Sequence, residues 1–159
     1  MGGMILTGFE GAGNSSQLIV SSVQTKAECR KLILPNDKER SVRLLYRELS
    51  SAPADYVVMM GQKPSIKDKI AVERCARLDG RELLSALDCD NIAEFFKAHG
   101  YDAYLSAGAG NSYCNHIYAH CLSVFPRGVF LHIPALRGIS DMDRLQRVVG
   151  QFLDWLSGL

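Results

Sequence analysis

The sequence predicts an α/β protein in which helices cover a mostly parallel sheet. Short apolar runs rich in branched residues alternate with longer segments of helical periodicity, and this alternation is typical of such folds. The chain has 159 residues, of which 47% are hydrophobic, enough for one substantial core and too few for two. We therefore expect a single domain over residues 1–159.

The first part of the chain supplies three strands and two helices. Asn14 and Ser15 are good N-cap types and open a helix that runs to Gln24. A second helix is apolar on one face and ends near Pro53. The strands are branched or continuously apolar runs, over residues 4–9, 31–34 and 56–60.

The remaining elements follow the same alternation. Residues 61–65 have the composition of a loop, and residues 70–78 alternate well enough to form one strand, with Glu73 and Cys75 on the same face. The other expected elements are a helix from Asp90 or Asn91 to a stop at Gly100, a strand over 103–106, a turn over 108–111, a helix that begins near Cys114, a strand over 128–133 and an amphipathic helix over 140–156.

Composition limits the partners and the compartment. Eighteen Lys and Arg against seventeen Asp and Glu give a charge of +1, which leaves no broad electrostatic surface for nucleic acid or an anionic membrane. No apolar run reaches the roughly 18 to 20 residues of a membrane helix, and the opening residues lack the pattern of a signal peptide. Five cysteines without a CxxC pair indicate reduced thiols. We expect a cytoplasmic protein whose partner is small and uncharged or is recognised locally.

Cys114 is the first candidate for chemistry. It follows the glycine-rich residues 108–110 at the start of a predicted helix, where unpaired backbone N–H groups and the helix dipole should favour a thiolate. The alternative is a cysteine that only fills space in the core. The glycine-rich approach favours a nucleophile.

His132 and Glu73 are the polar residues of two otherwise apolar strands. His132 lies near the end of its strand, and the carboxyl ends of strands line the functional crevice of open α/β sheets. A buried carboxylate such as Glu73 is costly unless it is paired, and a histidine is one such partner. The alternatives are a hydrogen-bonded structural histidine and a salt bridge from Glu73 to Arg74 or Arg77.

Four segments together resemble the pyroglutamyl peptidase I family, also called pyrrolidone-carboxylate peptidases. They occur in family order: Met4–Glu10 is similar to the opening strand, Ile70–Ala76 to the segment of the catalytic glutamate, Ala109–Asn115 to the nucleophile segment and Phe130–Pro134 to the histidine segment. The resemblance implies an αβα sandwich with a twisted central sheet. It also implies a cysteine peptidase that removes an N-terminal pyroglutamyl residue without a cofactor.

The resemblance assigns roles to particular residues. Cys114 would be the nucleophile, His132 its base, and Glu73 the group that orients the histidine. Substrate contacts would come from Phe9 and Gln62, and also from Arg81, if two residues are deleted between it and Glu73. The substrate would be an N-terminally blocked peptide or a small amide, and the tetramers of this family make a homo-oligomer an expectation.

The sequence also departs from the family pattern. The family carries a Pro-Phe pair in the loop after its first strand, whereas Glu10 here leads directly into Gly11, so one aromatic wall of the pocket is missing. The stretch between Glu73 and Cys114 is shortened. The alternative functions are therefore a hydrolase of the same mechanism with another small amide or ester as substrate, or a catalytically silent binding relative.

Two further patterns point elsewhere and are weaker. Residues 8–15 nearly match a P-loop, but Asn14 stands where the phosphate-binding lysine belongs, which argues against nucleotide hydrolysis. Cys114, His116, His120 and Cys121 lie in one predicted helix; at about 100° per residue the histidines and the cysteines face opposite sides. One ion could not bind all four, so we expect no metal.

Overall fold

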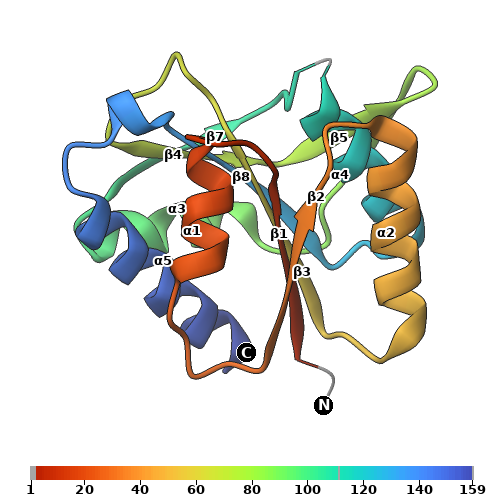
Figure 1. Cartoon of the computed structure of the whole chain (residues 1–159), viewed down its shortest axis with the longest axis horizontal. Coiled ribbons are helices and arrows are strands. Elements are labelled where there is room, and N and C mark those ends of the chain that lie inside the picture. Colours follow the sequence, from red (N-terminus) through yellow and green to blue (C-terminus); the bar gives the residue numbers. More distant parts are fainter. Residues whose placement is uncertain (1–2, 111, 159) are drawn as a thin grey trace.

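A six-stranded sheet forms the centre of the molecule (Figure 1). The computed structural model describes residues 3–110 and 112–158, and the strand order is β2-β1-β3-β8-β4-β7. The first four strands in this order are mutually parallel, whereas β4 and β7 run in the opposite direction. The strands are β1 (Met4–Phe9), β2 (Cys29–Leu34), β3 (Tyr56–Gln62), β4 (Lys69–Glu73), β7 (Asp102–Ser106) and β8 (Gly128–Ile133).

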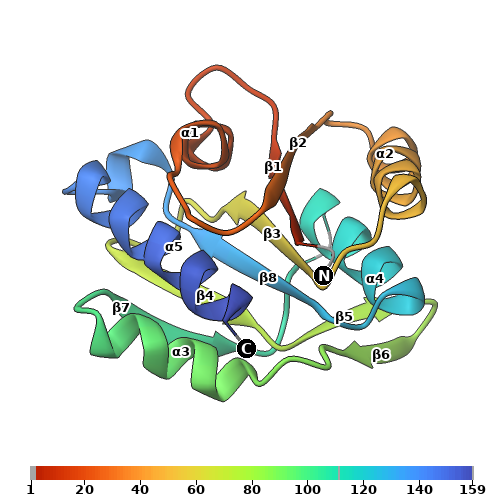
Figure 2. The same cartoon turned by 90° about the horizontal axis from the view of Figure 1, so that it is seen from below.

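Helices cover both faces of this sheet, as Figure 2 shows. One layer contains α1 (Ser15–Ser22), α3 (Cys89–Ala98) and α5 (Met142–Ser157). The other contains α2 (Lys38–Ser51), α4 (Tyr113–Val124) and the hairpin of β5 (Cys75–Leu78) and β6 (Arg81–Leu84). A short 3₁₀ helix, η1 (Leu136–Gly138), precedes α5. The expected α/β sandwich with a mostly parallel sheet is confirmed.

Alternation along the strands divides the interior into two cores. In β3, Val58 and Met60 pack under α1, α3 and α5, whereas Val57 and Met59 pack under α2 and α4. Side chains that follow one another in a strand point to opposite faces of the sheet. Every second residue of each strand therefore points toward α4, and the candidate site lies on this face of the sheet.

Side-chain caps define where most of the helices begin. The side chains of Asn14, Asp37, Asp88 and Asp141 each accept a hydrogen bond from a backbone N–H in the first turn of α1, α2, α3 and α5, which satisfies groups that the helix itself leaves unpaired. Ser112, the N-cap of α4, makes no such side-chain bond. Backbone N–H groups in the first turn of α4 are therefore not bonded by the side chain of its N-cap residue.

Three sequence expectations are wrong in detail. Residues 70–78 form two strands in different sheets, because the chain leaves the main sheet after Arg74. The Arg74 N–H still bonds to Ser106 of β7, whereas the Arg74 carbonyl accepts a bond from the N–H of Ser85, which follows β6. Gly61 and Gln62 belong to β3 and not to a loop, because they continue the pairing with β8. Strand β6 was not expected, since its residues are mostly exposed and lack apolar alternation.

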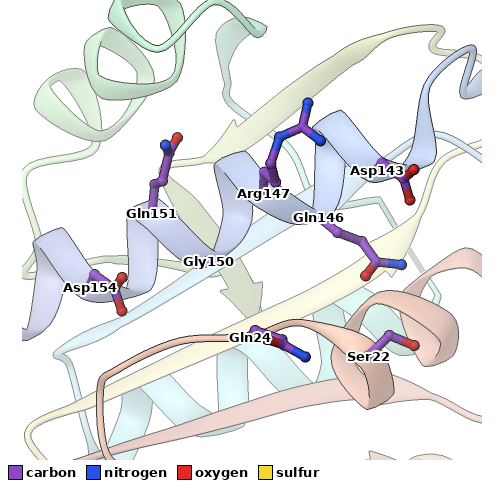
Figure 3. A pocket seen from close by; sticks show the side chains of 8 residues that line it. All are labelled: Ser22, Gln24, Asp143, Gln146, Arg147, Gly150, Gln151 and Asp154. Atoms are coloured by element: carbon purple, nitrogen blue, oxygen red, sulfur yellow. The ribbon is translucent and has the colours of Figure 1, made fainter.

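The contact between α5 and the end of α1 is unusually close. A Cβ at Gly150 would overlap the carbonyl oxygen of Gln24, so only glycine lets the helix approach this backbone. Beside it lies a polar groove of about 430 Å³ that includes Asp143, Arg147 and Asp154 (Figure 3). Among the residues that the structure describes, no helix is both long and apolar enough to cross a membrane.

Candidate active site

The register of three neighbouring strands aligns the candidate residues. Gly61 on β3 is the direct partner of His132 on β8. On the other side of β8, Glu73 of β4 is opposite Phe130, and residues two positions apart on a strand share a face. Glu73 is therefore a diagonal neighbour of His132, close enough for long side chains to meet. Gly61, His132 and Glu73 form a row across the sheet on the face toward α4.

Glu73 and His132 form a buried pair. The distance from the Glu73 Oε1 atom to the His132 Nδ1 atom is 3.6 Å, and the two side chains are 0% and 7% exposed. Neither Glu73 carboxylate oxygen nor His132 Nδ1 has another hydrogen-bond partner among the described residues. A buried carboxylate without partners is costly, so the imidazole is the group that compensates Glu73. The alternative, a salt bridge from Glu73 to Arg74 or Arg77, is absent among the residues that the structure describes.

Cys114 lies in the first turn of α4, over the end of β3. Its sulfur is 2.7 Å from the position that a Cβ of Gly61 would take, and the Phe130 ring borders the same point at 2.9 Å. Because Gly61 pairs with His132 and adjacent strands are about 4.8 Å apart, the sulfur is one strand away from the histidine. Asn111, in the turn expected before Cys114, lies outside the described residues.

The sulfur rests against the sheet and is not bonded to the histidine. Among the described residues, the hydrogen bonds include none between Cys114 Sγ and the His132 ring; the sulfur instead has the Ser112 side chain as partner. Cysteine has three staggered χ1 positions. Turning about this bond is the movement available to bring Sγ from Gly61 toward the neighbouring imidazole.

The ionisation of Cys114 differs from the expectation. The pKa of its thiol is raised to about 12: burial raises it most, the bond from Ser112 and that from the Cys114 backbone N–H lower it in part, and the charge of Glu73 raises it. The expected thiolate at the helix start is therefore wrong for the free protein, because loss of solvation outweighs the helix terminus. Cys114 in the free protein is therefore a neutral thiol at neutral pH.

Two side chains of α4 hold this helix against the strands that bear the site. The Tyr118 hydroxyl donates to the Glu73 carbonyl oxygen at 2.7 Å. The Asn115 amide accepts a hydrogen bond from the Arg77 N–H and donates one to the Arg77 carbonyl, both at 3.0 Å. Sequence reasoning missed both residues, although Tyr118 is four positions after Cys114, the spacing at which helical neighbours share a surface.

An aromatic pair joins the end of β1 to the start of α4. Phe9, at the end of β1, is 4% exposed and belongs to the same core as Phe130. Its ring centroid is 6.5 Å from that of Tyr113, the residue before Cys114, and Tyr113 is 41% exposed. Tyr113 was not among the expected site residues. Its ring lies beside that of Phe9, so the start of α4 adds a second aromatic side chain next to the end of β1.

Gln62 and Arg81, the two other expected substrate contacts, are not brought to Cys114. Gln62 follows Gly61 on β3 and so points to the opposite face, where its Oε1 accepts hydrogen bonds from the backbone N–H and the hydroxyl of Ser15. Arg81 is exposed at the start of β6, directly after the tight turn at Asp79 and Gly80, both of which have positive φ. None of the described contacts joins Gln62 or Arg81 to Cys114.

The site and the fold together define an α/β protein with a cysteine, a histidine and a glutamate at one sheet face. The crystal structure of pyrrolidone carboxyl peptidase from Fervidobacterium islandicum AW-1 is similar to this chain, with a TM-score of 0.83, 21% identity and coverage of 98% of each chain. Pyroglutamyl peptidase I from Bacillus amyloliquefaciens has a TM-score of 0.83, 20% identity and coverage of 98% of this chain and 97% of its own.

A third structure agrees with these two. Pyrrolidone carboxyl peptidase from Thermus thermophilus has a TM-score of 0.76 and 23% identity, and the match covers 95% of this chain and 98% of that chain. No protein-family model and no curated protein sequence matches the chain. The chain therefore has the fold of the pyroglutamyl peptidases over nearly its whole length, which confirms the resemblance at the level of the fold.

Proposed function

We propose that the chain is a cysteine peptidase that removes an N-terminal pyroglutamyl residue from a peptide. The observation that carries this proposal is the row of Cys114, His132 and Glu73, in which a buried imidazole lies between a carboxylate and the strand under the sulfur. A nucleophile, a base and a group that orients the base are the parts that acyl transfer requires. The shared fold of solved pyroglutamyl peptidases supports the substrate class.

The mechanism begins from a neutral thiol. His132 accepts the Cys114 proton as the sulfur attacks the scissile carbonyl, and the proton then passes to the leaving amine, so that a thioester remains on Cys114. Water, deprotonated by His132, hydrolyses this thioester and releases the acyl group. Glu73 stabilises the imidazolium that forms in both steps. The backbone N–H groups at the start of α4, which its N-cap side chain does not use, are donors for the oxyanion.

The aromatic pair supports an acyl group that is small, flat and uncharged. Phe9, at the end of β1, and Tyr113, the residue before Cys114, lie side by side, and a five-membered lactam can pack against an aromatic face. The Glu10-Gly11 sequence in place of the family's Pro-Phe favours a second candidate. This is a hydrolase of the same mechanism that takes another small amide or ester, because one wall of the family's pocket has a different composition.

A fluorogenic pyroglutamyl amide tests the proposal directly. We expect hydrolysis by the parent chain, none above background for Cys114→Ala, and a loss of about 10²- to 10⁴-fold for Glu73→Gln, which keeps the shape of the side chain and removes its charge. Mass spectrometry of a pyroglutamyl peptide should give free pyroglutamate and a peptide shorter by one residue.

A matched control distinguishes the alternatives. His116→Ala removes a half-buried histidine of α4 that has no role in the proposed mechanism, and it should leave hydrolysis intact. If a panel of small esters and amides is cleaved through Cys114 while the pyroglutamyl amide is not, the second candidate is supported. If Cys114→Ala is as active as the parent, both candidates are refuted.

A further inference from the structure

Two histidines of α4 lie side by side next to α2 (Figure 1). His116 and His120 are neighbours on the helix surface, since residues four positions apart share a face. Their ring centroids are 4.4 Å apart, with an angle of 51° between the ring planes, and both residues are half-buried. On the side of α2, the ring of Tyr46 packs edge-on against His120, at 6.5 Å between centroids.

Tyr46 determines which nitrogen of His120 is free. The Tyr46 hydroxyl donates to the His120 carbonyl oxygen at 3.2 Å, and this bond uses its single proton. The contact between the same hydroxyl oxygen and His120 Nδ1, at 3.4 Å, is then a bond that Nδ1–H donates. The lone pair of the imidazole lies on Nε2. Metal-ligating histidines show this arrangement, in which a neighbouring acceptor holds the ring N–H that does not face the metal.

His116 offers a neutral imidazole beside this ring. Loss of solvation lowers the pKa of His116 most, His120 and Lys38 lower it too, and Glu39 raises it. The ring is therefore mostly uncharged at pH 7, and a metal ligand must be uncharged to offer its lone pair.

The distance between the two rings is close to that of two ligands of one ion. With Zn–N bonds of about 2.0 to 2.1 Å and tetrahedral geometry, the centroids of two imidazole rings lie about 5 Å apart. The observed 4.4 Å therefore requires an adjustment of only about half an ångström, which side-chain torsions can supply. The pair also avoids the difficulty of the four-residue set considered from the sequence, because it needs no cysteine from the opposite side of the helix.

We infer that His116 and His120 bind one divalent transition-metal ion, such as Zn²⁺, through their Nε2 atoms, and that Tyr46 positions His120 for this. Imidazole suits such ions, whereas Mg²⁺ and Ca²⁺ prefer oxygen ligands. Among the described residues, no group of three or more His, Cys, Asp and Glu is placed to hold an ion. Water therefore completes the coordination, and the ion exchanges with solvent. The site is independent of the proposed peptidase function.

Calorimetric titration with ZnCl₂ tests this site. It uses the full chain with Cys114→Ala, so that the proposed nucleophile cannot bind the ion. We expect one Zn²⁺ per chain. Adding His116→Ala or His120→Ala should lower the affinity by at least about 10-fold, because each removes a ligand, and Tyr46→Phe, which removes only the hydroxyl, should lower it by about 10-fold.

His99→Ala is the matched control for these variants. His99 lies at the end of α3, where its ring stacks on Phe95, and its loss should leave the affinity within about twofold of the reference. An equal loss in His99→Ala and in the variants of the pair would refute the site, because general disturbance would then explain both. Unchanged binding in His116→Ala and in His120→Ala would refute it as well.

Nuclear magnetic resonance tests the same site without a substitution in the pair. Long-range ¹H–¹⁵N spectra of the histidine rings distinguish Nδ1 from Nε2. We expect Zn²⁺ to shift the Nε2 resonances of His116 and His120, to leave His99 unchanged, and to find His120 protonated at Nδ1 before the ion is added. If millimolar Zn²⁺ moves neither Nε2 resonance, the inference is wrong, whatever the calorimetric variants show.

Discussion

Two opposing effects act on the pKa of the Cys114 thiol, and the sequence alone does not show which is larger. The start of α4 favours a thiolate through the helix dipole, and burial against Gly61 and Phe130 disfavours any charge. Burial is the larger effect here and raises the pKa of the thiol to about 12. A base within reach is then required for reactivity at neutral pH, which is the role proposed for His132.

Alkylation of the free protein measures this balance. The rate at which iodoacetamide labels Cys114 should rise about tenfold for each pH unit from pH 7 to 9.5, because only the thiolate reacts and its fraction is far from saturation. Site-resolved mass spectrometry follows Cys114 apart from the other cysteines. A rate that is already constant between pH 7 and 8 would show a low pKa and contradict this account.

Gly61 determines how close the sulfur comes to the sheet. In Gly61→Ala the new Cβ would lie 2.7 Å from Cys114 Sγ and 2.9 Å from Phe130 Cζ, so the sulfur must move. We expect kcat for the pyroglutamyl amide to fall about 10- to 100-fold with a smaller change in KM, since misplacement of a reacting atom by about 1 Å has an effect of this size. Steady-state kinetics give both constants.

Gly108→Ala is the matched control for this substitution. A Cβ at Gly108 would meet no atom within 4 Å, although Gly108 also lies in the stretch that leads to Cys114. It should leave kcat within about twofold of the parent. Equal losses in the two variants would mean that general disturbance, and not contact with the sulfur, explains the effect of Gly61→Ala.

At the residue scale, the sequence was sufficient to find the candidate residues Cys114, His132 and Glu73, but not the residues that pack beside them. Cys114, His132 and Glu73 are polar or reactive residues in apolar or glycine-rich surroundings, and such a contrast is visible without coordinates. Gly61 and Tyr113 have no such signal. Gly61 matters because the Cys114 sulfur lies against it, and Tyr113 because the Phe9 ring lies beside it. These neighbours come from distant parts of the chain, so only the folded structure shows them.

At the scale of elements, apolar runs and caps were sufficient to predict most helices and strands. Strand β8 has the expected bounds, and the N-caps Asn14 and Asp141 lie within two residues of the expected starts of their helices. The break after Glu73 was not visible, because the alternation of residues 70–78 continues across it. At Arg74 the N–H still bonds to Ser106 of the main sheet while the carbonyl accepts a bond from Ser85, and the local pattern cannot reveal these distant partners.

Gly150 tests how tightly α5 packs on the connection after α1. In Gly150→Ala the new Cβ would overlap the Gln24 carbonyl oxygen, and neither of the two backbones can move without disturbing its neighbours. We expect the free energy of unfolding to fall by about 1 to 3 kcal/mol, although alanine is the better helix former. Urea unfolding followed by circular dichroism measures this change.

Gly158→Ala at the end of the same helix is the comparison. A Cβ there meets its nearest neighbour, the Trp155 carbonyl oxygen, at an ordinary 3.5 Å, and φ is −84°. Its stability should match the parent within about 0.5 kcal/mol. If Gly150→Ala is as stable as Gly158→Ala, the close approach seen between α5 and Gln24 does not constrain the fold.

At the scale of the whole molecule, the direction of β4 follows from the length of one connection. Residues 63–68 join β3 to β4, and a parallel crossover needs a dozen residues or more. Strand β4 must therefore run opposite to β3. The position of β8 between them is not predictable in this way, because β8 comes much later in the chain. Yet this late insertion is what brings His132 between Gly61 and Glu73.

Buried thiols make the stability of the whole molecule depend on alkaline pH. Desolvation by burial raises the pKa of Cys89 to about 11 and that of Cys114 and Cys121 to about 12. In the unfolded chain these thiols ionise near their ordinary pKa of about 8.5, so above that pH the native state holds more protons than the unfolded state. Their contribution to stability is complete below about pH 8.5 and is lost progressively as the pH rises toward 12.

The free energy of unfolding should therefore fall by about 2 to 3 kcal/mol between pH 8.5 and 9.5, since each thiol contributes up to about 1.4 kcal/mol per pH unit. Urea denaturation at pH 7.5, 8.5 and 9.5 under reducing conditions measures this slope. Cys121→Ala removes one of the thiols with a raised pKa, so its slope should be smaller than that of the parent, whatever its stability at pH 7.5. An unchanged slope in this variant would show that ionisation of the buried thiols is not what destabilises the protein in alkali.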